Sequence, residues 1–167
     1  MSNPIILIIS SIIVFTLVSC GDDARFFEKN IDIVDGEWSR DTIIDFDFEI
    51  KDTSAKYHLV YTIRNTANYP YYNLYLESEL VDSTGLIIDT FENEVYLFDA
   101  STGKPFGDKS SLLNSSIGDF YDGRYLCQSY YKFPRPGNYN LAIKQAMRDT
   151  GNLPEIIAVG LRIEKVN

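Results

Sequence analysis

Residues 44–50 alternate strictly between apolar and acidic side chains, in the order Ile-Asp-Phe-Asp-Phe-Glu-Ile. A period of two places successive side chains on opposite faces of a β-strand, so one face is buried and the other is solvated. Further strand-like stretches cover 57–64, 72–80, 124–133, 139–147 and 157–163, with 86–91 and 94–98 as one bent strand or two short ones. This series of short strands predicts an all-β fold, an antiparallel β-sandwich of immunoglobulin-like or jelly-roll kind.

Turn residues separate these stretches. Pro134-Arg135-Pro136-Gly137 is a sharp turn, because proline fixes φ and lacks a backbone N–H. Residues 99–119 form the longest irregular stretch. The composition of residues 139–147 also suits a helix. We favour a strand there, because the bulky residues alternate and follow a Pro-Gly turn.

The first twenty residues have the pattern of a bacterial lipoprotein signal peptide. Residues 1–19 carry no charged side chain, and the apolar run from Ile5 to Val18 is interrupted only by hydroxyl residues. The run is short for a membrane span and ends in Leu17-Val18-Ser19-Cys20. The Cys20 thiol can form a diacylglyceryl thioether, so we expect cleavage before Cys20 and lipidation of Cys20. The alternative is a short transmembrane anchor with an ordinary cysteine.

Three segments are therefore predicted. Residues 1–19 are the signal peptide, residues 20–41 are the lipidated cysteine and a tether, and residues 42–167 are the β-sandwich domain. We expect some local structure in the tether around its apolar residues, Phe26, Phe27, Ile31, Ile33 and Trp38. Each methylene that an acyl chain buries contributes about 0.8 kcal/mol, so two or more chains would hold the protein on a membrane.

The net charge of −9 lies entirely after residue 19. A strongly acidic domain is repelled by nucleic acids and anionic lipids, which argues against nucleic-acid binding. The two cysteines exclude a disulfide framework if Cys20 is lipidated, and Cys127 is expected to be a small apolar residue in a strand. His58 is the single histidine and is expected at the surface. We expect no cofactor and no catalytic residues.

One loop combines several aromatic residues with a stiffening proline: Tyr69, Pro70, Tyr71 and Tyr72. Aromatic side chains at a loop tip can stack on sugars or anchor a protein partner. They can equally fold over the end of the sandwich and close its core. The sequence leaves both roles open for this candidate interaction loop.

Asp119 and Asp122, with Asp108, are weak candidates for a Ca²⁺ site, because hard oxygen ligands suit that ion. Turn-forming aspartates are the alternative, and no complete calcium-loop spacing is present, so no metal site is predicted. A hydrolase with a pair of carboxylates would need a cleft in which the two lie about 5 to 9 Å apart. The sequence does not single out such a pair.

Several short motifs follow one another in order along the chain: Arg64-Asn65-Thr66, Tyr69-Pro70-Tyr71, Asn73-Leu74, Gly118-Asp119, Tyr121-Asp122, Phe133-Pro134, Pro136-Gly137, Tyr139, Gln145-Ala146-Met147-Arg148 and Val159-Gly160-Leu161-Arg162-Ile163-Glu164. With the signal-peptide end and Trp38, this set resembles the gliding-motility lipoprotein GldH family of Bacteroidetes. The resemblance covers nearly all of the mature chain.

The resemblance implies a lipid-anchored, non-enzymatic component of the gliding-motility and type IX secretion apparatus. It carries over no catalytic residue. Other gliding-machinery proteins are the implied partners, and the implied location is the cell envelope, with the outer membrane favoured. A surface module that binds glycan or protein through Tyr69–Tyr72 is the alternative function.

Overall fold

The computed structural model describes residues 25–111, 119–148 and 151–166. They form eleven strands and one 3₁₀ turn. In chain order these are β1 Arg25–Asp32, η1 Val34–Gly36, β2 Glu37–Ser39, β3 Ile44–Ile50, β4 Lys56–Thr66, β5 Asn73–Asp82, β6 Ile87–Tyr96, β7 Asp108–Ser111, β8 Asp119–Tyr131, β9 Gly137–Gln145, β10 Asn152–Pro154 and β11 Ile156–Val166.

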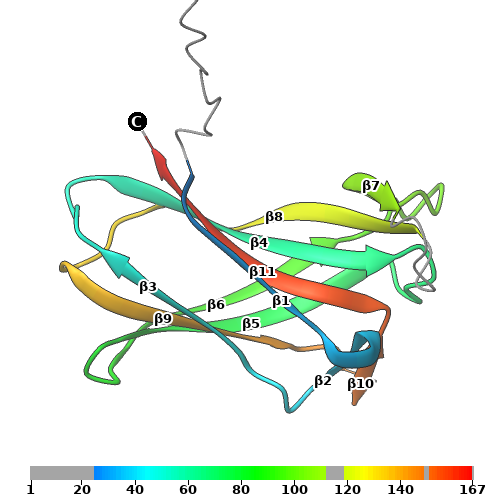
Figure 1. Ribbon diagram of the computed structural model, residues 1–167, viewed down its shortest axis with the longest axis horizontal. Helices are drawn as coiled ribbons and strands as arrows, with labels where there is room; N and C mark the ends of the chain where they lie inside the picture. Colours follow the sequence, from blue (N-terminus) through cyan, green and yellow to red (C-terminus); the bar gives the residue numbers. More distant parts are fainter. Residues whose placement is uncertain (1–24, 112–118, 149–150, 167) are drawn as a thin grey trace, which may run out of the picture.

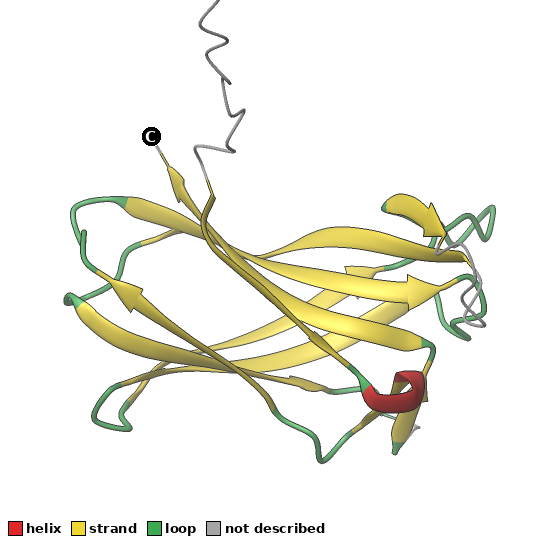
Figure 2. Ribbon diagram, viewed as in Figure 1, coloured by secondary structure: helices red, strands yellow, loops and turns green. Residues whose placement is uncertain are grey.

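Two antiparallel sheets face each other and enclose the core (Figure 1). The five-stranded sheet has the order β1-β11-β4-β8-β7, and the four-stranded sheet has the order β3-β9-β5-β6. A short pair, β10-β2, lies at one end. Figure 2 shows that strands account for nearly all of the regular structure. The predicted antiparallel β-sandwich is confirmed.

Alternating side chains fill the space between the sheets. In β3 each apolar residue is buried and each acidic residue is exposed, as the period-two pattern predicts. Aromatic rings gather at one end of the core, where Phe133 lies 4.9 Å from Tyr139 and 5.5 Å from Tyr57, between ring centroids. Cys127 is buried in β8, as predicted, and burial raises the pKa of its thiol to about 11.

Most expected strands agree with the structure within a few residues. The segment 139–147 is a strand in β9, and β6 is one continuous strand. The long irregular stretch is shorter than predicted, because β7 lies within it and β8 already begins at Asp119. Both strands carry charged and hydroxyl residues at their start, which hides the alternation.

The expected boundary at residue 42 is corrected by β1 and β2, which lie in the segment assigned to the tether. β1 pairs with β11 from Arg25 to Asp32, and Phe27 packs against Phe48 with ring centroids 5.7 Å apart. Trp38 is fully buried, and its indole N–H donates to the Thr42 carbonyl at 3.1 Å. The sandwich therefore begins at Arg25 within the described residues. Cys20 and the predicted signal peptide lie outside them.

Candidate interaction surface

The tyrosine loop joins β4 to β5, and the structure divides its residues between core and surface. Tyr69 is 5% exposed, stacks on Phe98 at 6.2 Å between ring centroids and donates its hydroxyl to the Asn73 carbonyl at 2.8 Å. Burial raises the pKa of Tyr69 well above its ordinary value. Tyr69 therefore closes the end of the core, which is one of the two roles that the sequence left open.

The other residues of this loop face outward. Pro70 is exposed, and Tyr71 is 36% exposed with its ring in edge contact with Tyr69. Tyr72 is 48% exposed and stacks on Tyr96 of β6, with ring centroids 6.0 Å apart and planes inclined by 17°. The accessible part of the predicted loop is therefore Pro70 to Tyr72.

The β5–β6 pairing extends this aromatic surface beyond the loop. Tyr96 lies opposite Asn73, and Tyr75 lies opposite Glu94, on the outer face of the four-stranded sheet. Tyr75 and Tyr96 are 41% and 49% exposed. Both act on the Glu94 carboxylate, and Tyr72 stacks on Tyr96. We call Tyr72, Tyr75, Tyr96, Glu92 and Glu94 the tyrosine–carboxylate surface.

The Glu94 carboxylate is held in place by neutral donors. The Asn73 side-chain amide donates to it at 2.6 Å, and the hydroxyls of Tyr75 and Tyr96 also favour its charged form. These interactions, that with Asn73 first, lower the pKa of Glu94, so it stays ionised at neutral pH. The surface thus presents a fixed negative charge framed by aromatic rings.

Sequence reasoning missed Tyr75, Tyr96, Glu92 and Glu94 as site residues. The alternation of β5 already placed Tyr75 on the solvated face. The pairing register of β5 with β6 decides which side chains meet Tyr75, and alternation within one strand carries no information on register.

Asp119 and Asp122, the weak calcium candidates, lie on strand β8 rather than in a loop. Residues three apart in a strand point to opposite faces. Asp122 accepts from Arg64 Nε at 2.8 Å, and Asp119 pairs with Lys109 at 2.6 Å. Asp108 lies directly opposite Asp122 on β7. The carboxylates of Asp119 and Asp122 are therefore each paired with a basic side chain from a neighbouring strand.

Across the described residues, no group of three or more His, Cys, Asp and Glu side chains is arranged to hold a metal ion. His58 contacts Tyr130, whose backbone N–H donates to His58 Nδ1 at 3.3 Å. The part of the chain with described coordinates also contains no helix of sufficient length and apolarity to cross a membrane.

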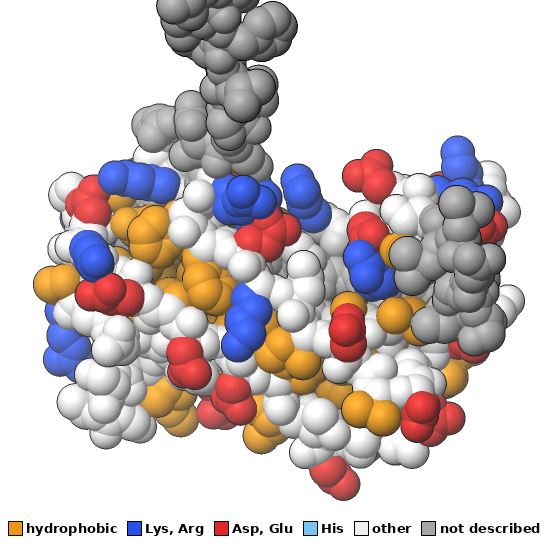
Figure 3. All heavy atoms as spheres, in the orientation of Figure 1, with side chains coloured by type: hydrophobic (Ala, Val, Ile, Leu, Met, Phe, Trp, Pro, Cys, Tyr) orange, Lys and Arg blue, Asp and Glu red, His pale blue; other side chains and the backbone are white. Residues whose placement is uncertain are grey.

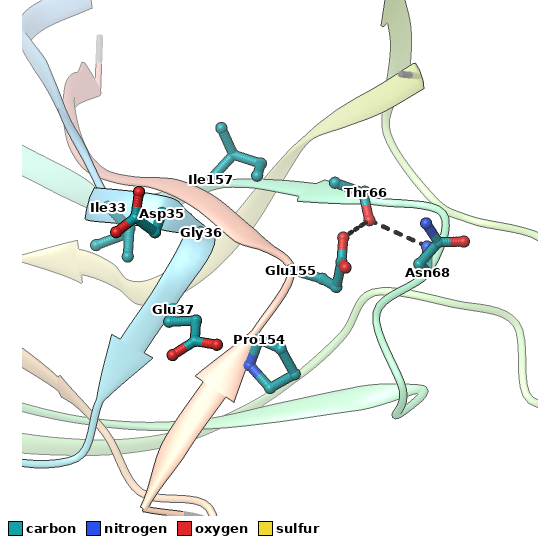
Figure 4. A pocket seen from close by; sticks show the side chains of 9 residues that line it. All are labelled: Ile33, Asp35, Gly36, Glu37, Thr66, Asn68, Pro154, Glu155 and Ile157. Atoms are coloured by element: carbon teal, nitrogen blue, oxygen red, sulfur yellow. Dashed lines mark hydrogen bonds between the residues drawn. The ribbon is translucent and has the colours of Figure 1, made fainter. Parts of the chain in front are cut away.

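A pocket of about 530 Å³ lies between η1 and the start of β11 (Figure 4). Its carboxylates belong to Asp35, Glu37 and Glu155. Glu155 points toward Thr66 and accepts the hydroxyl hydrogen bond of that residue, whereas Asp35 and Glu37 lie on the other side of the pocket (Figure 4). These carboxylates do not converge on one point, so the pocket lacks a paired acid and base.

The face formed by β1, β11 and β4 carries side chains of both charge signs (Figure 3). At its centre, Arg162 is 2% exposed and forms ion pairs with Glu28 at 2.9 Å and with Glu164 at 2.5 Å. The charges on this sheet are thus largely matched within the protein.

The fold and the surface together define a β-sandwich protein with an exposed aromatic and acidic face. Residues 25–163 match the family model described as GldH lipoprotein. The chain belongs to the GldH lipoprotein family, as the sequence motifs predict.

Two relatives align over nearly their full lengths. The gliding motility lipoprotein GldH of Flavobacterium johnsoniae is 30% identical over 170 residues, which cover 98% of this chain and 96% of the relative. The gliding motility lipoprotein GldH homolog of Christiangramia forsetii is 32% identical over 164 residues, which cover 92% and 93%. Dimeric latent PorU from Porphyromonas gingivalis aligns structurally at a TM-score of 0.35 and 11% identity, over 84% of this chain and 13% of PorU.

Proposed function

We propose that this chain is a lipid-anchored, non-enzymatic component of the gliding-motility apparatus that acts by binding other envelope proteins. The observation that carries the proposal is the nearly end-to-end match to a protein named gliding motility lipoprotein GldH. The match includes both ends of the sandwich, so it concerns the whole domain rather than one motif.

The anchor is proposed at Cys20, which follows an uncharged apolar run and sits in the sequence Leu17-Val18-Ser19-Cys20. Acyl chains on this residue would attach the acidic domain to the cell envelope. We place the attachment at the outer membrane and the partners in the gliding and type IX secretion machinery.

A non-enzymatic role is supported by the absence of convergent chemistry in the described residues. Asp35, Glu37 and Glu155 point apart, Cys127 is buried with a raised pKa, and His58 lies beside Tyr130. A binding role, in contrast, needs only an accessible surface on a rigid scaffold.

The proposal is tested by deleting the gene and restoring it as wild type or as Cys20→Ala. We expect deletion to stop gliding, the wild type to restore it, and Cys20→Ala to restore neither gliding nor labelling of the protein by a fatty-acid probe. Gliding by the deletion strain would overturn the motility role. A labelled Cys20→Ala protein would overturn the anchor. Secreted protein profiles of the same strains test the link to type IX secretion, and fractionation of the envelope tests the outer membrane.

A second candidate function is a surface module that binds glycan, and the exposure of Tyr72 and Tyr96 favours it. Neutral oligosaccharides should then shift the tyrosine resonances of this surface in an NMR titration. An unchanged spectrum at millimolar oligosaccharide would exclude this candidate.

A further inference from the structure

The outer face of the four-stranded sheet carries more carboxylates than the basic side chains around it can pair with. Glu77 of β5 and Glu92 of β6 are directly opposite each other in the antiparallel register. Like charges in this arrangement destabilise a sheet. Lys144 of β9 reaches Glu77 at 3.1 Å, whereas Glu92 has no ion-pair partner among the described residues.

The acidic character extends across the face. Further carboxylates point outward from β3 and β5, at Asp45, Asp47, Glu49 and Glu79. Lys144 is the only basic residue in strands β3, β5, β6 and β9. The opposite sheet matches its charges, as at Arg162, so the excess of carboxylates is specific to this face.

A hollow of about 450 Å³ opens beside the tyrosine–carboxylate surface. Its lining includes Tyr75, Glu77, Glu92, Glu94 and Arg148. The hollow therefore combines three carboxylates with the ring of Tyr75 and one guanidinium, so its lining carries a net negative charge. Its position next to the Tyr72–Tyr96 stack joins it to the accessible part of the tyrosine loop.

We propose that the tyrosine–carboxylate surface docks a partner protein segment that carries exposed Lys or Arg side chains. A cation on such a segment pairs with Glu92 and Glu94 and lies against the rings of Tyr75 and Tyr96, which attract cations through their faces. Asn73 holds the Glu94 carboxylate in place before the partner arrives, so little ordering is needed on binding.

Charge complementarity selects this class of partner. Nucleic acids and anionic lipids are repelled by the face, and a neutral sugar gains nothing from the unpaired Glu92. Arg suits the surface better than Lys, because its planar guanidinium both stacks on aromatic rings and binds carboxylates through two N–H groups. The inference deepens the proposed function and rests on it, since it names the surface and the chemistry of the partner.

The binding test uses the full-length lipoprotein in neutral detergent and fluorescently labelled octaarginine, octalysine and octaglutamate peptides. We expect octaarginine to bind tighter than octalysine, and octaglutamate not to bind. Glu92→Gln with Glu94→Gln should weaken octaarginine binding at least tenfold. Tyr75→Ala with Tyr96→Ala should also weaken it severalfold, although these changes leave the net charge unaltered.

Two matched controls separate a docking surface from general charge attraction. Asp45→Asn with Asp47→Asn removes the same charge from β3 of the same face, and Asp35→Asn with Glu37→Gln removes it near η1. Both should retain affinity within about twofold. Equal weakening by all three acidic double variants, or no effect of the tyrosine variant, would overturn the proposed surface.

The consequence in cells is tested with Glu92→Lys, which reverses the unpaired charge. Replacing one member of the Glu77–Glu92 pair by Lys should raise the melting temperature, while gliding is lost and fatty-acid labelling stays normal. Normal gliding by Glu92→Lys would overturn this surface as the docking site. That result leaves the proposed function standing, because the deletion strain and Cys20→Ala test it independently.

Discussion

The hydroxyl groups of Tyr61 and Ser78 lie 2.7 Å apart in the core and connect the two sheets of the sandwich. Tyr61 belongs to β4 and Ser78 to β5, and Tyr61 also donates to Asn93 Oδ1 of β6 at 3.0 Å. The bond is buried, so its partners cannot turn to water if it is removed.

Tyr61→Phe should lower the free energy of unfolding by about 1–3 kcal/mol, because the buried Ser78 hydroxyl loses this hydrogen-bond partner. The double variant Tyr61→Phe with Ser78→Ala should cost less than the sum of the two single changes. Urea unfolding of the four proteins measures both effects. Strictly additive costs would show that the two hydroxyls do not interact.

Acid should weaken the turn that begins at Asp82. Its carboxylate accepts from the Thr84 hydroxyl at 2.6 Å and backbone at 2.8 Å, and Arg135 pairs with it, which together lower its pKa. A depressed pKa contributes stability that is complete above about pH 4, the ordinary range of Asp, and is lost as the pH falls below it. The stability gap between wild type and Asp82→Asn should therefore shrink from pH 6 to pH 2. Asp32→Asn is the control, and its stability gap to wild type should change less over the same pH range. A gap for Asp82→Asn that stays constant from pH 6 to pH 2 would contradict the stabilising role of the Asp82 carboxylate.

Close packing on the outer side of β11 depends on Gly160. A Cβ at this position would lie 2.7 Å from the Lys29 carbonyl oxygen and closer still to the side chains of Asn30 and Thr62. Gly160→Ala should therefore lower the unfolding free energy by about 1–3 kcal/mol through overpacking. Gly151→Ala, where nothing lies within 4 Å of the new Cβ, should change it by less than about 0.5 kcal/mol. Similar values for both glycines would argue against the close approach.

The division of the tyrosine loop predicts opposite phenotypes for two neighbouring residues. Tyr69→Ala should destabilise the protein by about 3–5 kcal/mol, because a buried aromatic side chain leaves a cavity. Tyr72→Ala should cost less than about 1 kcal/mol and affect octaarginine binding instead. Thermal unfolding and peptide titration of both variants test this division. Equal loss of stability would place both tyrosines in the core.

The extent of the domain can be tested by expressing two shortened chains. A chain beginning at residue 25 retains β1 and β2, whereas a chain beginning at residue 42 leaves β11 as an unpaired edge and uncovers Phe48. We expect the shorter chain to unfold at lower urea concentration and to aggregate, since unpaired edges pair with other chains. Size-exclusion chromatography and circular dichroism compare the two. Equal stability of the two shortened chains would show that the folded domain begins at residue 42, as first expected.

The strands that sequence alone predicted are those in which bulky apolar residues occupy every second position, such as Ile44–Ile50 and the part of β11 from 157 to 163. The sequence did not predict β1, because it is an edge strand in which exposed and half-buried residues do not alternate, and its apolar residues Phe26 and Phe27 are adjacent. A bulge between Arg25 and Phe27 accounts for that break in register.

The candidate surface shows the same limit. The tyrosine loop was visible as a cluster of neighbours in the chain, but Tyr96 joins it only through the pairing of β5 with β6. Local patterns predict which face a side chain occupies. They do not predict which residue from another strand meets it, and both the Glu77–Glu92 pair and the Tyr72–Tyr96 stack depend on that pairing.

The start of β1 at Arg25 determines how far the domain can travel from the proposed lipid. Four residues, 21–24, lie between Cys20 and Arg25, so the chain makes five residue-to-residue steps, each of which spans at most about 3.3–3.6 Å. The segment between the lipid and β1 therefore spans at most about 18 Å, which is less than the thickness of a membrane. The anchored sandwich could rotate but would stay next to the lipid surface. It would meet partners by lateral diffusion in the membrane plane, so only proteins that reach the same membrane surface could bind it.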